Sequence, residues 1–261
     1  MRRYALMILR LCFVVAGTSV IAVFGLVIAR QWLSPEVLRA SNGEVGNYLQ
    51  ALGTIYAVLL AFVVFSVWNQ FNEARVNVDR EANEVVDLFR TSDGFPDEQR
   101  AHMQAELHRY VDAVIDEEWP AMVAGDEGTI ERIGAQLDVI WNSLHGFEPA
   151  SECHKALHAE ALTLFNELSN ARTARLSSAR MRIPPGLRLF LYAGALIMVG
   201  SMYLLAVDSF AIHAVISGAL AGAVSHILYL VSDLDDPFSG EWRVWPTPFE
   251  RVQRYMARRS R

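Results

Sequence analysis

Two histidines at helical spacing are the first residues of this sequence that suggest chemistry. His154 and His158 lie four apart in a predicted helix, the spacing that places two imidazoles on one metal ion, and Glu152 and Glu160 lie nearby. The pattern lacks the glutamate of an HExxH motif and a third ligand at a set distance. A solvated helical face explains it better, so we expect no metal site here.

A third histidine, His226, is the ionisable group closest to the middle of an apolar segment. An ionisable residue inside a membrane span is a functional-site hypothesis by default, because burying it in hydrocarbon is costly. His226 is therefore a candidate intramembrane polar site, which would line a water-filled path or titrate there. The alternative is a neutral imidazole bonded to a neighbouring helix, through Ser225 or Tyr229.

An acidic run, Asp116-Glu117-Glu118, ends in Trp119-Pro120. Charged rings of this kind select ions at pore mouths, so these carboxylates are candidate vestibule charges. The alternative is an ordinary solvated helix end. The sequence contains no nucleophile elbow, P-loop, dinucleotide-binding glycines or paired catalytic carboxylates. We therefore predict no catalytic residue, no cofactor and no enzyme activity.

The elements that carry these residues are predicted to be membrane helices, because hydrophobic residues make up 52% of the 261 residues and gather in four charge-free runs. A hydrocarbon layer about 30 Å thick needs roughly 20 apolar residues in a helix. Each run can span it: 19 residues between Arg10 and Arg30, 28 between Glu44 and Glu73, 19 between Arg188 and Asp208, and 24 between Asp208 and Asp233. The prediction is an all-α polytopic membrane protein with four transmembrane helices. It excludes a soluble enzyme and a nucleic-acid-binding protein, so no nucleic acid is expected as a partner.

The predicted domains follow these runs: transmembrane helices 1 and 2 in residues 1–69, a helical region in 70–186, transmembrane helices 3 and 4 in 187–232, and a basic tail in 233–261. Arginines near the span ends, including Arg2 and Arg3, fall on one side of the membrane if there are four spans. Positive charges stay in the cytoplasm, so both termini and the region between spans 2 and 3 are predicted to be cytoplasmic.

The region between spans 2 and 3 is predicted to be helical throughout, with breaks at residues 93–96, 125–128 and 146–149 and a last helix from Ala150 to about Met181. The second span contains no glycine or proline near its end, so we expect one helix to run from the membrane into this region. Residues 70–186 carry 21 acidic and 11 basic side chains, a local balance of −10. The free cysteines, Cys12 and Cys153, are expected to form no disulfide.

Small residues at a spacing of four are expected at helix packing faces. They are Gly53, Ala57 and Ala61 in the second span, and Gly218 and Gly222, a GxxxG pair, in the fourth. Small side chains let helix backbones approach closely where no hydrophobic force drives them together.

Another set of residues in the second span, Gln50, Thr54 and Val58, lies about 60° around the helix from the small residues. If the small residues pack against a neighbour, this second set faces a lumen or another subunit.

Several segments carry a resemblance to a known family. They are Gly53–Arg75, which includes Trp68-Asn69-Gln70-Phe71, then Glu81-Ala82-Asn83, Glu118-Trp119-Pro120 and Pro237-Phe238-Ser239-Gly240. Over residues 45–250 the chain resembles the bacterial bestrophin-like family, which is distantly similar to the bestrophin ion channels. The order of two spans, a cytoplasmic helical insert, two spans and a cytoplasmic tail is also similar.

The resemblance implies a homo-oligomeric ion channel, pentameric in bestrophins, whose second span lines the pore with hydrophobic side chains spaced by four. Carried onto this chain, these pore-lining positions are Gln50, Thr54 and Val58. Two of the three are polar, so a hydrophobic neck would lie deeper, at Phe62 or Phe65.

The sequence departs from the bestrophin pattern at the calcium site. Bestrophins place an acidic run directly after a Pro-Phe-Gly, whereas this chain continues Gly240-Glu241-Trp242-Arg243, and its aspartates 233, 235 and 236 precede the motif. We therefore expect the calcium clasp to be absent.

The resulting hypothesis is a bacterial inner-membrane oligomer, favoured as a pentamer, that conducts inorganic ions passively and is surrounded by membrane lipids. The negative electrostatic field of the acidic region, residues 70–186, would favour cations over anions. The alternative is a non-conducting membrane anchor whose cytoplasmic helices bind a partner protein. Only the channel requires second spans around an axis with a continuous passage.

Overall fold

The structure, a computed structural model, describes residues 2–33 and 35–259, with the side chains of residues 2–7, 35 and 37 outside that description. Within these limits it is helical and contains no strand, as predicted. The helices are Arg2–Trp32 (α1), Pro35–Ala40 (α2), Asn42–Thr91 (α3), Asp97–Ala113 (α4), Trp119–Ala124 (α5), Glu127–His145 (α6), Glu152–Arg180 (α7), Pro185–Met202 (α8), Phe210–Leu234 (α9) and Thr247–Arg259 (α10). A 3-10 turn, Ser92–Gly94 (η1), and a π-helix, Val114–Glu118 (η2), complete the described secondary structure.

Four helical stretches within the described residues are long and apolar enough to cross a membrane: Ile8–Trp32, Asn42–Gly94, Glu152–Met202 and Phe210–Leu234. The first and last correspond to α1 and α9. The apolar part of the second is the first half of α3, and that of the third is α8. The prediction of four spans is thereby confirmed.

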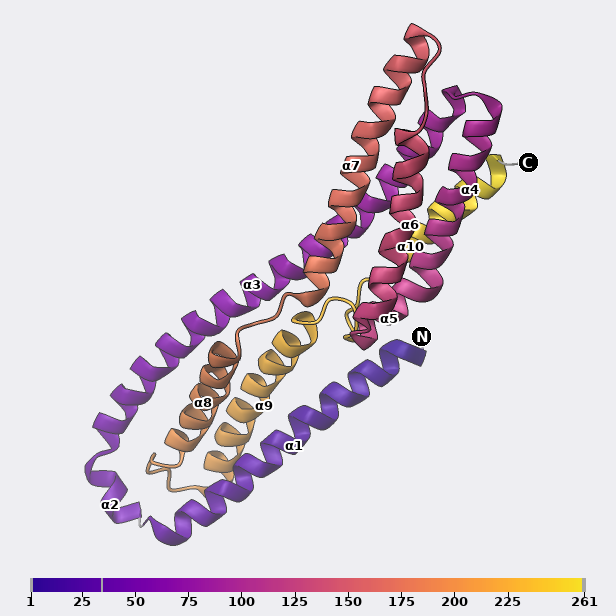
Figure 1. Cartoon of the computed structure of the whole chain (residues 1–261). Helices are drawn as coiled ribbons and strands as arrows, with labels where there is room; N and C mark the ends of the chain where they lie inside the picture. The colour runs from indigo at the N-terminus through magenta and orange to yellow at the C-terminus, as the bar shows by residue number, and fades with distance from the viewer. Residues whose placement is uncertain (1, 34, 260–261) are drawn as a thin grey trace. The chain divides into compact units, whose positions relative to one another are not determined.

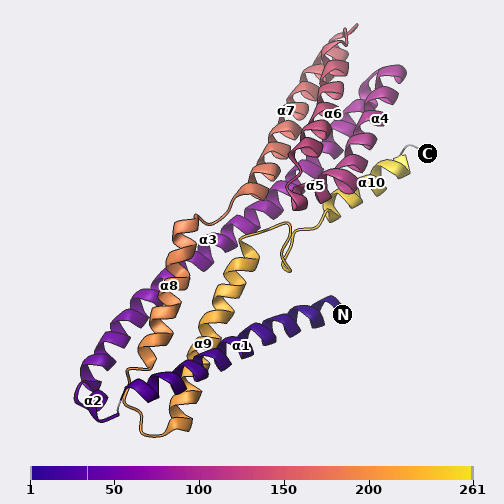
Figure 2. The ribbon, with the colours of Figure 1, turned by 60° about the horizontal axis from the view of Figure 1, so that its bottom comes forward.

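The chain forms two compact units, and the first contains residues up to Asn69 together with Arg182–Asp235. In this membrane unit α1 and α9 lie side by side, and α8 packs against α9 (Figures 1 and 2). Hydrogen bonds join the end of α1, the segment between α8 and α9, and the start of α9. Arg30 donates to the Val207 carbonyl and contacts His213 Nδ1 at 3.1 Å, and His213 Nε2 lies 2.9 Å from the Met202 oxygen. His213 is therefore buried among helix ends.

Helix α3 is a single helix of 50 residues, about 75 Å long at 1.5 Å per residue. After Gly53 it contains no glycine or proline until η1, so nothing in the sequence interrupts its hydrogen-bond ladder. The predicted continuation of the second span into the following region is confirmed. The boundary between the two units falls within this helix, between Asn69 and Gln70.

The second unit contains Gln70–Met181 and the segment from Asp236 onward. In this helical unit α4, α6 and α7 lie along the second half of α3 (Figure 2). The predicted breaks occur where expected: Gly125 ends α5 at a φ of +71°, a conformation that glycine adopts without strain. The predicted last helix is α7, which begins where the Ser151 side chain accepts a bond from the His154 amide and ends before Pro184.

The last helix, α10, and the short α2 are absent from the sequence-based predictions. Phe249, Val252 and Met256 of α10 are buried, at helical spacings of three and four. On its other side, Arg251 pairs with Asp79 at 3.1 Å. Part of the segment predicted as a basic tail, Thr247–Arg259, is thus a helix packed into the helical unit.

Candidate functional site

The first half of α3 has one face packed on its own chain and one face left uncovered. Tyr56, Leu60, Val63 and Val67 are buried. The Tyr56 hydroxyl donates to the Leu191 carbonyl of α8 at 2.9 Å. This bond ties α3 to α8 along a single side of the helix.

The uncovered face of α3 contains all five residues predicted to line a pore. Gln50 and Thr54 are exposed, and Thr54 donates its hydroxyl hydrogen to the Gln50 carbonyl. Val58, Phe62 and Phe65 are 52%, 70% and 63% exposed in the single chain. Large apolar side chains this exposed on a membrane helix face lipid, a neighbouring subunit or a hydrophobic constriction.

The small residues of the second span differ in their surroundings. Gly53 lies close to α8, where a Cβ atom would be 3.3 Å from Met198 Cε. Ala57 and Ala61 are exposed in the single chain. Of the three, Gly53 therefore packs against another helix of the chain.

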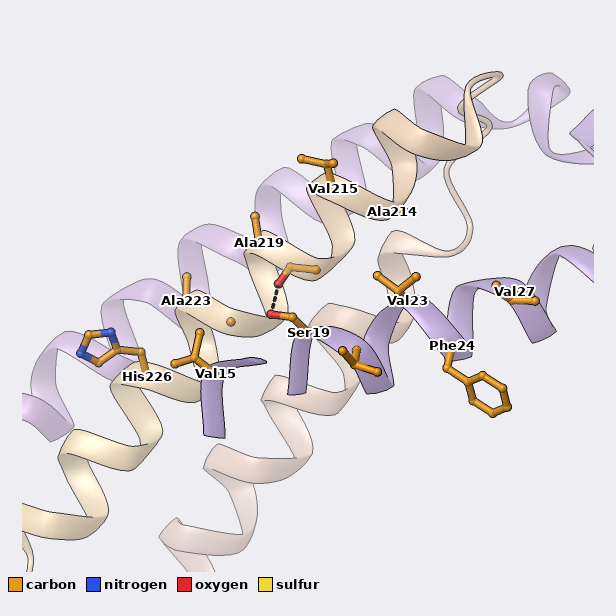
Figure 3. Close-up of a pocket in the computed structure, with 13 residues that line it drawn as sticks. Val15, Ser19, Val23, Phe24, Val27, Ala214, Val215, Ala219, Ala223 and His226 are labelled. Carbon is orange, nitrogen blue, oxygen red and sulfur yellow. Dashed lines mark hydrogen bonds between the residues drawn. The ribbon is translucent and has the colours of Figure 1, made fainter. Parts of the chain in front are cut away.

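The GxxxG pair of α9 lies against α1. A Cβ atom on Gly218 would be 3.5 Å from Val23, and one on Gly222 would be 2.9 Å from the Ser19 hydroxyl. Ser19 donates to the Gly218 carbonyl at 2.9 Å, as the dashed line in Figure 3 shows. The two glycines thus allow the Ser19 side chain of α1 to reach the backbone of α9 inside the membrane unit.

His226 lies on the exposed side of α9, in line with Ala219 and Ala223, at one end of the crevice between α1 and α9 (Figure 3). Ser225, a suggested partner for it, instead bonds Thr18 of α1 at an oxygen separation of 2.7 Å. His226 is therefore directed away from the rest of the chain on this side of α9.

The acidic run corrects one prediction. Asp116 and Glu117 are exposed, and Glu117 pairs with Arg132, but Glu118 is completely buried. Its carboxylate accepts hydrogen bonds from Arg172 and Arg175 of α7. Glu118 is therefore a neutralised interior group and not a vestibule charge. The run occupies the π-helix η2, whose wider turn changes which side chains face inward.

Arg175 is the centre of a buried ionic cluster that the sequence analysis did not identify. Its Nε donates to Glu81 at 2.6 Å and its Nη2 donates to Glu118 at 2.5 Å, and both carboxylates and the guanidinium are fully buried. The Tyr110 hydroxyl donates to Glu81 at 2.5 Å. With Arg172, the cluster contains two carboxylates and two guanidinium groups, so its charges balance.

Aromatic rings enclose this ionic cluster. The Arg175 guanidinium carbon lies 5.7 Å from the ring centre of Trp119 and 5.8 Å from that of Phe249. Phe238 packs edge-on against Trp119, with ring centres 5.5 Å apart. Three of the resembling segments, at Glu81, at Trp119 and at Phe238, therefore meet at one place in the helical unit.

The cluster shifts the ionisation of its members. Burial raises the pKa of Tyr110 well above its usual value, and the Glu81 carboxylate raises it further. Burial alone would lower the pKa of Arg175, but the carboxylates of Glu81 and Glu118 raise it well above its usual value. The tyrosine therefore remains a neutral donor and the arginine remains a cation.

The two histidines weighed as metal ligands make other contacts. His158 Nε2 lies 2.9 Å from the Leu144 carbonyl, and the Phe147 ring packs edge-on against both imidazoles. No group of three or more His, Cys, Asp or Glu side chains in the described part of the chain could hold a metal ion.

A family model, the bestrophin-like domain, matches residues 13–249. The chain belongs to the bestrophin-like family. This membership identifies a membrane protein related to ion channels. No curated protein sequence matches the chain.

Solved structures of a bacterial bestrophin homolog from Klebsiella pneumoniae share the fold of this bestrophin-like chain. A single-residue mutant of that homolog has a TM-score of 0.72 at 14% identity, covering 94% of this chain and 98% of that one. The structure solved by zinc phasing has a TM-score of 0.70 at 16% identity, covering 93% and 97%. A second mutant has a TM-score of 0.68 at 18% identity, covering 96% and 98%.

Proposed function

We propose that this bestrophin-like chain is one subunit of an oligomeric channel that conducts ions passively along a pore lined by α3. The observation that carries the proposal is the uncovered face of α3. Counted at 100° per residue, Val58 and Phe65 lie about 180° around the helix from the middle of the buried face at Tyr56 and Leu60. A helix packed on one side only can present its other side to a shared axis.

The side chains along this face suggest how the pore is built. Gln50 and Thr54 offer polar groups near one end of the span, and Phe62 and Phe65 offer rings further along. We propose the two phenylalanines as the hydrophobic neck, which gates by excluding water when it is narrow.

The remaining architecture of the proposed channel follows the sequence prediction. We propose a pentamer in the bacterial inner membrane, with transmembrane residues 1–69 and 187–232 and with cytoplasmic residues 70–186 and 233–261. Arginines at the span ends support this orientation. The side chains of Arg2 and Arg3, which contribute to it, lie outside the described residues. Membrane lipids and inorganic ions are the proposed partners.

The charge of the helical unit supports a preference for cations. Gln70–Met181 and the segment from Asp236 onward hold 24 acidic and 16 basic side chains, a balance of −8. Glu118 does not contribute a free charge, whereas Asp116 and Glu117 remain at the surface. A negative field of this kind raises the local concentration of cations.

Ion flux into liposomes tests the proposal. In bilayers under a KCl gradient, we expect the reversal potential to shift from zero toward the equilibrium potential of potassium. We also expect Phe62→Ala to change the conductance. Phe190→Ala is the matched control, because Phe190 is a similarly exposed phenylalanine on α8, at 62% against 70%. Absence of flux from a verified oligomer would instead favour a non-conducting anchor that binds a partner protein.

A further inference from the structure

A groove lies in the membrane unit between α1 and α8, with α9 as its floor. Thr18 and Ile21 line it from α1, Ala195 and Val199 from α8, and Leu228 from α9. Its volume is about 440 Å³, within the range of ligand sites, and most of its lining is aliphatic. In a bilayer such a groove must be filled, because an empty one forfeits packing contacts on every wall.

The length and the polar end of the groove favour a lipid over a neighbouring helix. The lining on α9 extends from Ala221 to Ser232, eleven steps along the helix or about 16.5 Å. A lipid can fill this largely aliphatic length with an acyl chain and place a charged headgroup beyond one end, whereas an apolar helix could only cover the aliphatic walls.

Three hydroxyls along the groove are already hydrogen-bonded within the protein. The hydroxyls of Thr18 and Ser225 lie 2.7 Å apart, and the Tyr203 hydroxyl donates to the Ala22 carbonyl at 2.8 Å. These three hydroxyls keep their hydrogen bonds when an apolar chain enters the groove, so binding carries no desolvation penalty for them.

One end of the groove combines aromatic hydroxyls with a cation. Tyr192, Tyr229 and Ser232 line this end. Arg188 lies one turn before Tyr192 on the same face of α8 and pairs with Asp235, while about half of its side chain is exposed. A guanidinium has five N–H donors, more than one carboxylate can accept, so Arg188 retains donors for an anion.

We propose that this groove binds a bilayer phospholipid, with one acyl chain along α9 and the phosphate at Arg188. The apolar length and the cationic end of the groove match the two parts of such a molecule. The proposal does not depend on whether the protein conducts ions.

Native mass spectrometry of the full chain with dioleoyl phosphatidylglycerol tests the site. We expect retained lipid on each subunit, and we expect Ala195→Phe and Val199→Phe, two independent groove-filling changes, to abolish retention. Ala219→Phe, on the side of α9 that faces the other crevice, should retain the lipid as the parent does. If both filling variants retain as much lipid as the parent, or if they alter the oligomer and not the lipid content, the proposal is overturned.

A second pair of variants tests the headgroup contact and does not fill the groove. Arg188→Gln should weaken lipid binding about fivefold, the factor expected from about 1 kcal/mol per cation near an anionic lipid. Asp235→Asn breaks the same ion pair but keeps the cation, so it should bind at least as well as the parent. Equal losses from both variants would show that the ion pair only supports the fold, and would overturn the phosphate assignment.

Discussion

Removal of the cation from the buried cluster of the helical unit should destabilise the protein strongly. Arg175→Met leaves the carboxylates of Glu81 and Glu118 buried without their main partner. Because all three groups are fully buried, solvent screens none of this loss. Breaking a buried ion pair by removing one partner costs about 3–5 kcal/mol.

The exposed pair of Arg132 and Glu117 provides a matched control, with side chains 60% and 48% exposed. Arg132→Met should cost about 0–1 kcal/mol, because surface ion pairs contribute little. At about 2–4 °C per kcal/mol, Arg175→Met should lower the apparent melting temperature by roughly 6–20 °C, and Arg132→Met by a few degrees at most.

Apparent melting temperatures in one detergent and at one heating rate measure both effects. The combination of Arg175→Met with Glu81→Gln and Glu118→Gln should recover part of the loss, because it removes the charges left without a partner. Equal shifts for the two arginine variants would refute the reasoning, since burial would then make no difference to the pair.

Three further predictions concern packing and pH. Gly194→Ala should lower stability by about 1–3 kcal/mol, because its Cβ would lie 2.6 Å from the Tyr56 ring. The added Cβ of Gly200→Ala, on the same helix, would meet nothing within 4 Å, so this variant should not destabilise the protein. Melting curves of both variants check this difference. Burial, and after it a neighbouring carboxylate, raises the pKa of Glu84, so folding favours its protonated form and stability falls as pH rises through the raised pKa. Glu84→Gln should therefore flatten the dependence of melting temperature on pH between 4 and 7. An unchanged slope would contradict this prediction. Phe249→Ala should cost about 3–5 kcal/mol through a cavity under α10, and a change below 1 kcal/mol in denaturant unfolding would show that α10 is not part of the core.

The spans and the breaks in the helical region at residues 93–96, 125–128 and 146–149 could be predicted because their causes are local. Charge-free runs mark the membrane segments, and the absence of glycine and proline after Gly53 keeps α3 continuous. Helix α10 has a local signal too, the spacing of Phe249, Val252 and Met256, although arginines dominate the composition of the segment.

The buried cluster could not be predicted because its cause is not local. Arg175 and Glu81 are distant in the sequence and nothing in either segment specifies the other. The inward direction of Glu118 depends on the π-helix η2, and no residue pattern in the run Asp116-Glu117-Glu118 distinguishes the buried carboxylate from the two exposed ones.

Access of water to the uncovered face of α3 tests the central claim most directly. Single cysteines at Val58, Phe62, Leu60 and Phe190, in a chain with Cys12 and Cys153 replaced by serine, would be treated in liposomes with a charged thiol reagent. Since the thiolate is the reactive form and needs water, cysteines at positions 58 and 62 should react. Those at buried Leu60 and at Phe190, which is exposed on α8 and which we propose to face lipid, should not. If positions 58 and 62 are as unreactive as position 190, this face of α3 lies against lipid or protein, and the account of a pore along it is wrong.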